Sequence, residues 1–360
     1  MKIVVFAGGV GTRLWPLSRK NSPKQFGKIV GTQSTLQQAI ERLLPEFNAS
    51  DIYIATGEKY KDIVIEQLPT IPKENFIFEP TLQDVGPAIG LSSFLLEKKF
   101  SHEPVAIIWS DHIVKNEVAF RQALRLAEKQ ILDAESEFIF IAQKARFANQ
   151  NCGWIELGEK INNNDTTAIF KFKRLCYRPK PEEAEEFYKN KNFVWNLGYF
   201  VSTPKYLKTM YKNYMPEMYE KLLKIQATIG TPDYKKTLHK IYPTIEKISF
   251  DDAILVKLNP DGFRVIASDL SWSDIGTWDA LKEALAQDKD ENITLGSVLL
   301  EDAKDTLLFN YTNKLCIGID LNEVIIINTD DVLLVCPKNS VPKIKKFVEK
   351  LDGTIHEHLV

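Results

Sequence analysis

A glycine-rich segment near the N-terminus holds the first residues whose types and spacing suit chemistry. Residues 6–19 read FAGGVGTRLWPLSR, in which an apolar strand leads to Gly8, Gly9 and Gly11 and then to the cation Arg13. Glycine loses much conformational entropy on folding, so a cluster of glycines indicates a turn that lets a ligand approach the backbone. Backbone N–H groups in such a turn bind anions. This segment therefore favours a phosphate-bearing ligand.

Two familiar phosphate-binding patterns do not fit the segment. The P-loop pattern GxxxxGK[ST] is absent, and the dinucleotide pattern GxGxxG fails because Leu14 stands at its last glycine. This argues against a dinucleotide-dependent dehydrogenase. Arg13 and, in SPKQF, Lys24 are two cations near one glycine turn. A guanidinium grips phosphate oxygens bidentately and an ammonium adds a point charge, which suits a triphosphate. The alternative is a tight turn with two solvated cations.

Two aspartates that are far apart in the sequence stand where metal-binding carboxylates are useful. Asp111 follows the apolar strand VAIIW, and Asp274 lies in SWSDIGTW before a predicted helix. Phosphoryl-transfer sites hold Mg²⁺ with one or two carboxylates and phosphate oxygens. The alternative for either aspartate is a turn or a helix N-cap. For His112, a positioning hydrogen bond is favoured over metal ligation or acid–base chemistry.

The composition limits the class of protein. The chain has 360 residues, 44% of them hydrophobic, and a net charge of −2, so no basic field indicates a nucleic-acid partner. Four cysteines stand far apart without CxxC spacing. No apolar run approaches the roughly 18 residues of a membrane span, and the first apolar run is too short for a signal peptide. We expect a cytoplasmic protein that binds neither nucleic acid nor membrane.

Short apolar runs alternate with helical periodicity through the first half of the chain. Strands are predicted over 3–7, 51–57, 75–80, 105–111 and 137–143, and helices over 87–99 and 117–132. This alternation predicts an α/β, Rossmann-like, mixed but mainly parallel sheet with helices on both faces. Ligands of such sheets bind beyond the carboxyl ends of the strands. The glycine segment and Asp111 both follow predicted strands.

The pattern changes in the second half of the chain. Helical sequence is expected over 204–228 and again over 276–287, and from about 292 to 340 the segments are short and β-rich, followed by a helix over 341–351. The Asp-rich stretch at 288–292 is the expected boundary. We predict a catalytic domain over 1–288 and a β-rich C-terminal domain, ending in a helix, over 289–360.

The N-terminal motifs resemble those of a known family. FAGGVGTRLWPLSR followed by SPKQF is similar to the signature of sugar nucleotidyltransferases, specifically of bacterial-type mannose-1-phosphate guanylyltransferases (GDP-mannose pyrophosphorylases). The tryptophan and the PKQF form favour this branch over glucose-1-phosphate thymidylyl- and uridylyltransferases. The resemblance covers most of the chain. It implies synthesis of GDP-mannose and pyrophosphate from GTP and mannose 1-phosphate, with Mg²⁺ assisting in-line attack on the α-phosphate.

The resemblance also implies roles for individual residues. It assigns the nucleotide to Gly8, Gly9, Gly11, Thr12, Glu79 and Pro80, the phosphates and the reacting phosphorus to Arg13 and Lys24, and paired metal ligation to Asp111 and Asp274, which match the family's SDH and WSDxGxW motifs. It further implies that the C-terminal segment is a small β-helix-like domain through which the chain self-associates as a homodimer. We expect no isomerase activity of the kind that the family's bifunctional members carry in a further domain.

Two segments match the family's sugar-binding motifs. CGWIE places Gly153 where the backbone approaches the sugar, and FVWNLGYF places Asn196 where an amide hydrogen-bonds sugar hydroxyls. The alternative for Asn196 is a turn residue beside a buried Trp195.

Two other segments depart from the family. Its EKP is here Tyr177-Arg178-Pro179, so the sugar-facing glutamate becomes tyrosine, and its Asn-Thr-Ala becomes Asp84-Val85-Gly86. The loss of a carboxylate changes hydroxyl recognition. The alternatives are therefore a guanylyltransferase for another sugar 1-phosphate, such as a manno-heptose, and a non-catalytic nucleotide-binding homologue.

Overall fold

The structure is a computed structural model that describes residues 1–9, 11–20, 22–161 and 167–360. Val10, within the glycine segment, lies outside these residues. The chain packs into two compact units. The first comprises Met1–Gly8, Glu41–Trp109 and Val114–Trp272, and the second comprises Gly9–Ile40, Ser110–Ile113 and Ser273–Val360. Because these units group residues by packing alone, the predicted domain boundary at residue 288 stays a prediction.

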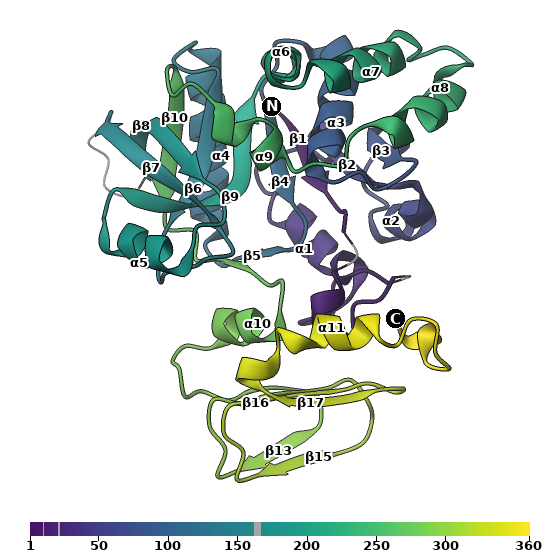
Figure 1. The fold of residues 1–360 in the computed structure, drawn as a ribbon, viewed down its shortest axis with the longest axis vertical. Coiled ribbons are helices and arrows are strands. Elements are labelled where there is room, and N and C mark those ends of the chain that lie inside the picture. Colours follow the sequence, from purple (N-terminus) through teal and green to yellow (C-terminus); the bar gives the residue numbers. More distant parts are fainter. Residues whose placement is uncertain (10, 21, 162–166) are drawn as a thin grey trace. The chain divides into compact units, whose positions relative to one another are not determined.

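A mixed sheet forms the centre of the first unit (Figure 1). In the described part of the chain it has nine strands, in the order β3 (Phe76–Glu79), β2 (Ile52–Gly57), β1 (Lys2–Phe6), β4 (Val105–Trp109), β9 (Phe193–Ser202), β6 (Phe138–Lys144), β10 (Phe263–Ser268), β8 (Thr167–Cys176) and β7 (Gly153–Lys160). Only β9 and β8 run against the other strands. The central strands are continuous apolar runs such as VAIIW because both faces of the sheet are covered. The predicted mixed α/β sheet is confirmed.

Helices lie on both faces of this sheet (Figure 1). Phe120 of α4 (Glu117–Leu132) contacts Tyr199, whereas Phe250 of α9 (Phe250–Ala253) stacks on Phe200. Successive side chains of a strand point to opposite faces, so α4 and α9 cover different faces. The other helices of this unit are α2 (Lys61–Gln67), α3 (Val85–Phe100), α5 (Pro181–Lys189), α6 (Pro204–Tyr214), α7 (Pro216–Ala227) and α8 (Tyr234–Ile241).

The helical region predicted over 204–228 is present as two helices. α6 ends at Tyr214 and α7 begins at Pro216. Proline has no N–H to continue the hydrogen-bond ladder and suits the first turn of a helix, so Pro216 begins a new helix. None of the helices among the described residues is both long enough and apolar enough to cross a membrane.

The second unit holds short strands that pack on helices. One sheet comprises β12 (Ile293–Leu295), β14 (Leu307–Asn310), β16 (Val324–Asn328) and β17 (Leu333–Pro337), and β13 (Val298–Glu301) pairs in parallel with β15 (Cys316–Ile319). Trp278 of α10 (Trp278–Leu285) packs edge-on against Phe309 of β14. The predicted β-rich segment is followed by α11 (Lys343–Glu349). The β-helix-like arrangement of its strands stays a prediction.

Three further elements stand at the ends of the segments that define the units. They are α1 (Thr35–Glu41), β5 (His112–Val114) and β11 (Trp272–Asp274), of which β5 and β11 pair as a two-stranded sheet. Asp111 directly precedes β5, and Asp274 is the last residue of β11. The two predicted metal ligands therefore stand next to paired strands.

Candidate active site

The glycine segment needs glycine at two of its three predicted positions. Gly9 and Gly11 have φ values of 92° and 62°, a left-handed region that favours glycine. A Cβ on Gly11 would also lie 2.9 Å from Lys24 Cγ. Gly8 is exposed, and a Cβ there would meet nothing within 4 Å. Gln25, which the sequence analysis did not single out, is fully buried and donates from Nε2 to the Gly9 carbonyl at 3.2 Å. The Gln25 side chain thus stabilises the glycine turn through this hydrogen bond.

Lys24 and Asp111 form a partly buried ion pair, in which the Asp111 side chain is 26% exposed. Lys24 opens the 3₁₀ turn Lys24–Phe26 after Pro23 and is only 7% exposed, and its Nζ lies 2.7 Å from Asp111 Oδ2. Two charges that are removed from water need each other, because breaking one partner leaves the other uncompensated. These residues are predicted to have different roles, one on the phosphates and one on the metal ion, and the structure brings them into contact.

Charge around Lys24 keeps both members of the pair ionised. Burial disfavours the charged Asp111 carboxylate, but the Lys24 ammonium outweighs it and holds the pKa of Asp111 at about 2. Burial likewise disfavours the charged lysine, and Asp111 followed by Asp274 raises the pKa of Lys24 above its ordinary value, against the opposing effect of Arg13. Two carboxylates and one further cation therefore act on a single ammonium.

Arg13 lies beside the second aspartate. Arg13 is exposed in the 3₁₀ turn Thr12–Leu14. A Cβ built on Gly276 would lie 3.1 Å from Arg13 Nη2 and 3.2 Å from Asp274 Oδ1. The glycine of the WSDIG segment thus leaves room for the guanidinium next to Asp274. The structure brings Arg13, Lys24, Asp111 and Asp274 together in the second unit.

The Nε2 atom of His112 lies near Asp111 without hydrogen-bonding its Oδ1 atom. The two atoms are 3.9 Å apart, which is beyond hydrogen-bond distance. The predicted positioning role of His112 therefore stays a prediction.

The oxygen donors at this position suit a hard divalent cation. Asp111 and Asp274 supply carboxylate oxygens, and Lys24 Nζ already marks a place where a cation is favoured. Among the described residues no group of three or more His, Cys, Asp or Glu side chains could hold a metal ion. Mg²⁺ needs no such group, because one or two carboxylates, substrate phosphates and water complete its shell. The residues present therefore fit Mg²⁺.

Three of the predicted sugar-binding residues meet in the first unit. Gly153 of β7 is opposite Asn196 of β9, and a Cβ on Gly153 would lie 3.2 Å from Asn196 Cβ and 3.7 Å from Tyr177 Cδ2. Arg178 is exposed and places its guanidinium 4.9 Å from the centre of the Tyr177 ring. Asn196 lies inside a strand, so the alternative of a turn residue is wrong.

A carboxylate that the sequence analysis missed also belongs to this group. Asn196 Nδ2 donates to Oδ1 of Asp251 at 3.1 Å. Burial raises the pKa of Asp251 to about 6 and Asp252 adds to the rise, while Arg178 and the Asn196 amide oppose it. In the sequence, SFDDAIL is typical of a helix start with an N-cap serine and an acidic first turn. This segment therefore predicts a helix start and gives no indication of a sugar-binding role.

Glu79 and Pro80, the remaining predicted nucleotide-binding residues, stand at the end of β3. Glu79 is 5% exposed, and its Oε2 accepts a 2.6 Å hydrogen bond from the hydroxyl of Tyr242. Burial raises the pKa of Glu79 to about 7, with Tyr242 opposing and Asp84 adding to the rise. Tyr242 carries no motif in the sequence, and Pro80 is half-buried.

The departure at Asp84-Val85-Gly86 has a local structural role. Asp84 is the N-cap of α3 and its side chain accepts from the Val85 N–H at 2.7 Å. A Cβ on Gly86 would lie 2.6 Å from the Ile248 carbonyl oxygen, so no larger residue fits there. This segment therefore starts a helix and packs closely against residue 248.

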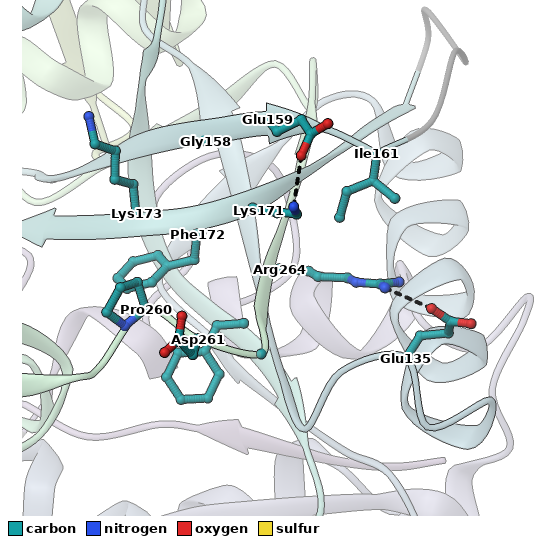
Figure 2. Close-up of a pocket in the computed structure, with 12 residues that line it drawn as sticks. Glu135, Gly158, Glu159, Ile161, Lys171, Phe172, Lys173, Pro260, Asp261 and Arg264 are labelled. Atoms are coloured by element: carbon teal, nitrogen blue, oxygen red, sulfur yellow. Dashed lines mark hydrogen bonds and ion pairs between the residues drawn. The ribbon is translucent and has the colours of Figure 1, made fainter.

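A cavity of about 450 Å³ lies elsewhere in the first unit (Figure 2). Its lining cations are paired locally, Lys171 with Glu159 and Arg264 with Glu135, each at 2.7 Å. Phe263 lines this cavity and pairs with Phe138, the first residue of β6. Asn196 pairs with Ala142, which is near the other end of β6. The cavity is therefore separate from the predicted sugar-binding residues Gly153, Asn196 and Tyr177.

Known proteins are similar to this chain along most of its length. The sequence pattern of the nucleotidyl transferase family matches residues 2–291. The chain belongs to the nucleotidyl transferase family. A mannose-1-phosphate guanylyltransferase of Salmonella montevideo is 30% identical over 99% of this chain and 75% of its own length, and one of Salmonella typhimurium is 29% identical over 97% and 72%. The predicted family membership is confirmed, and this nucleotidyl transferase is an enzyme of that class.

A solved structure supports the fold of this nucleotidyl transferase. It is described as a mannose-1-phosphate geranyltransferase from Thermus thermophilus, has a TM-score of 0.85 and covers 98% of this chain and 99% of its own. At 24% identity this similarity bears on the fold alone. Nearly the whole chain, including its β-rich end, thus shares the fold of this solved structure.

Proposed function

We propose that this protein is a mannose-1-phosphate guanylyltransferase that makes GDP-mannose and pyrophosphate from GTP and mannose 1-phosphate. The observation that carries the proposal is the partly buried Lys24–Asp111 pair, with Asp274 acting on the same ammonium, next to a left-handed glycine turn. Phosphoryl transfer is catalysed mainly by positioning and by charge neutralisation, which such a group provides. Relatives of this name align with nearly the whole chain.

The proposed reaction is a single in-line displacement. An oxygen of the sugar phosphate attacks the α-phosphorus of GTP, the new O–P bond forms, the bond to the bridging oxygen breaks and pyrophosphate leaves. A phosphate monoester has a second pKa of about 6, so the attacking group is largely dianionic at pH 7 and needs no general base. Arg13, Lys24 and the amides of the glycine turn neutralise and align the phosphates.

The other residue assignments are part of the same proposal. The nucleotide is assigned to Gly8, Gly9, Gly11, Thr12, Glu79 and Pro80, and the sugar to Gly153, Asn196, Tyr177 and Arg178. The left-handed turn supports the first set, and the proximity of Gly153, Asn196 and Tyr177 supports the second. The catalytic domain is proposed to span 1–288, in keeping with a family match that ends at residue 291.

Nucleotidyltransferases of this type use a divalent metal ion, and we propose Mg²⁺ here. Asp111 and Asp274 are the residues that would hold it. A bound Mg²⁺ supplies positive charge that stabilises the phosphate oxygens during transfer. Because Lys24 already occupies Asp111 Oδ2, the ammonium and the metal ion are expected to share the two carboxylates.

A second candidate function keeps the chemistry and changes the sugar. Tyr177 replaces the family's glutamate and lies beside Gly153, another predicted sugar-binding residue. A phenol in place of a carboxylate alters which hydroxyls are recognised. Transfer to another sugar 1-phosphate, such as a manno-heptose 1-phosphate, is therefore the alternative.

Pyrophosphate release tests these proposals directly. The enzyme is assayed with Mg²⁺ and GTP across a panel of sugar 1-phosphates, with ATP, UTP, CTP and dTTP as controls. Release with GTP and mannose 1-phosphate alone supports the main proposal. GTP-dependent release with another sugar favours the second candidate. Silence across the panel with GTP still bound indicates a non-catalytic nucleotide-binding homologue.

We also propose that the C-terminal domain over 289–360 is β-helix-like and that it joins two copies of the chain as a homodimer. We further propose that the protein is cytoplasmic. Leu299, Ile317 and Ile319 are each about 60% exposed on the paired strands β13 and β15. A contiguous exposed apolar strip is typical of an interaction surface. Ile317→Lys is expected to shift the chain to a monomer in sedimentation, and an unchanged dimer would place the interface elsewhere.

A further inference from the structure

Among the described residues, the carboxylate that contacts Asn196 is that of Asp251, which lies outside the Tyr177-Arg178-Pro179 segment where the family has its glutamate. Tyr177 offers a hydroxyl and an aromatic ring. Asp251, from the short helix α9, is the residue that accepts from the Asn196 amide. The position of this carboxylate indicates what it can bind.

The orientation of the Asn196 side chain is set by two hydrogen bonds. Its Oδ1 accepts from the Gly198 N–H at 3.1 Å, and its Nδ2 donates to Asp251 Oδ1 at 3.1 Å. The backbone donor requires the oxygen of the amide at that position, which leaves the NH₂ group facing Asp251. Among the described residues the second N–H of Asn196 has no partner. A donor and a carboxylate are therefore held side by side.

Asp251 has acceptor capacity to spare. A carboxylate offers about four lone-pair positions, and Asn196 is the one side chain among the described residues that donates to it. Arg178 lowers the pKa of Asp251 by its charge, but the described residues form no ion pair with Asp251. Burying a carboxylate without a cation opposes folding, and such costs persist mainly where they serve function.

A sugar diol matches this pair of groups. One hydroxyl can accept from Asn196 Nδ2 while it or its neighbour donates to the Asp251 carboxylate, because every hydroxyl is both a donor and an acceptor. Tyr177 and the open backbone at Gly153 border the same place. A phenol cannot act as an ionised acceptor at neutral pH, whereas Asp251 can.

We propose that Asp251 acts with Asn196 to bind two neighbouring hydroxyls of the sugar 1-phosphate, in the role that Tyr177 does not fill. This inference rests on the proposed function and makes Asp251 a specificity-determining residue. The substrate class that it selects is a sugar 1-phosphate with a free vicinal diol. Sugars that lack one of these hydroxyls are poor substrates.

The test combines one variant with modified substrates. Asp251→Asn is assayed for pyrophosphate release with mannose 1-phosphate and its 2-, 3- and 4-deoxy analogues. A hydrogen bond to a charged group corresponds to roughly a 10- to 100-fold effect, so KM for mannose 1-phosphate is expected to rise by about that factor. KM for GTP is expected to stay within about twofold. Wild type is expected to use one of the deoxy analogues less well than mannose 1-phosphate. Asp251→Asn is expected to use that analogue and mannose 1-phosphate equally well.

Matched variants separate binding from structural support. Asp252→Asn makes the same change at the next residue, which is exposed and accepts from Ser249 Oγ at 2.7 Å. It is expected to leave KM for the sugars unchanged at pH 7.5, because Asp252 only adds to the rise in the pKa of Asp251 and Asp251 is ionised at that pH with or without it. The double variant with Tyr177→Glu and Asp251→Asn is expected to regain part of the affinity for mannose 1-phosphate, because it returns a carboxylate to the predicted sugar-binding residues. If Asp251→Asn does not fold, Asn196→Ala with the same analogues tests the same pair of hydroxyls.

The outcomes distinguish this inference from the proposed function. If wild type releases no pyrophosphate with any sugar 1-phosphate, the proposed function fails and the inference fails with it. If wild type is active and Asp251→Asn keeps the same preference for the parent sugar over every analogue, the inference alone is overturned. A uniform loss with all sugars assigns Asp251 a structural role, which also overturns it.

Discussion

Two carboxylates in this protein, Asp111 and Asp251, have pKa values that are shifted in opposite directions. Asp111 pairs with the Lys24 ammonium at 2.7 Å, and its pKa is held at about 2. Asp251 pairs with the neutral amide of Asn196 at 3.1 Å, and its pKa rises to about 6. Burial raises the pKa of both groups, and the cationic partner of Asp111 outweighs burial whereas the amide partner of Asp251 does not.

The difference matches what each region is proposed to bind. A carboxylate held with a cation stays ionised and suits a place where phosphates and a metal ion meet. A carboxylate held with an amide keeps free lone pairs and suits hydroxyl groups, which carry no charge. The contrast shows how one residue type serves charge neutralisation in one region and hydrogen-bond recognition in the other.

The largest expected effect comes from removing a phosphate-side carboxylate. Asp111→Asn and Asp274→Asn are each expected to lower kcat/KM by about 10³-fold or more, because the metal ion and Lys24 lose an anionic partner. Steady-state pyrophosphate release measures the loss. Asp352→Asn, which removes an exposed pair with Lys20, serves as the control. Near-normal rates in either aspartate variant would contradict the metal assignment.

The next effect concerns the cation of the pair. Lys24→Met is expected to lower kcat by about 10²-fold, since it removes charge next to the transferred phosphate. Without the ammonium, burial is opposed by His112 and by the Asp111 backbone N–H but no longer by Lys24, so the pKa of Asp111 rises from about 2. Activity should then fall toward acidic pH more steeply than in wild type. A kcat/KM profile from pH 5.5 to 8 checks this, with the exposed Lys20→Met as control; parallel profiles would show that Lys24 does not set the ionisation of Asp111.

A smaller effect concerns the pH dependence of sugar binding. The titratable and charged groups around Asp251 are Asp252, Arg178 and Tyr177, and the neutral Asn196 amide donates to it. Because the pKa of Asp251 is about 6, its carboxylate is neutralised as the pH falls through 6, and KM for the sugar 1-phosphate is expected to rise by about 10-fold. The substrate phosphate titrates near the same pH.

Asp251→Asn isolates the contribution of the residue from that of the substrate. Both proteins share the titration of the substrate phosphate, so the difference between their KM profiles reports Asp251. A ratio of the two KM values that does not change between pH 5 and 7.5 would contradict the assignment.

The smallest effect is on stability, and its sign differs between the two regions. The folded-state pKa of Asp251, about 6, lies above the ordinary 3.8, so its ionisation opposes folding above that pH and the cost disappears as the pH falls toward 4. Asp251→Asn is expected to raise the free energy of unfolding at pH 7.5 by about 1–2 kcal/mol. The pKa of Asp111 is lowered instead, so its contribution is present above about pH 4 and is lost as the pH falls through 2.

Asp111→Asn should therefore destabilise the fold, by about 1–3 kcal/mol, because Lys24 stays buried without its nearest partner. Urea unfolding of both variants at pH 7.5 and pH 5 measures the two signs. Shifts in the same direction would show that the contrast between the regions does not extend to stability.

Much of the phosphate-side group was predictable from short windows of sequence. Arg13 and Lys24 follow glycine and proline signals, and Asp111 comes after a continuous apolar strand. Strand ends and turns are encoded by neighbouring residues, so these positions need no knowledge of distant contacts. The partly buried contact between Lys24 and Asp111 was not predictable, because it depends on how segments 87 residues apart pack.

The sugar side shows where sequence reasoning ends. Gly153 and Asn196 were found by motif, but their pairing depends on the register of β7 and β9. Asp251 is 55 residues from Asn196 and resembles an ordinary helix start. Tyr242 is likewise 163 residues from Glu79, whose carboxylate it contacts.

By itself the sequence determined the alternation of strands and helices, the glycine turn, the strand-end aspartates and the family. These features depend on residue type and local spacing, which act over a few residues. Only the tertiary structure decided which side chains meet and how strongly water is excluded from them. Those quantities set the charge of Asp111 and of Asp251, because the pKa of a carboxyl group depends on its burial and its partners rather than on its neighbours in the chain.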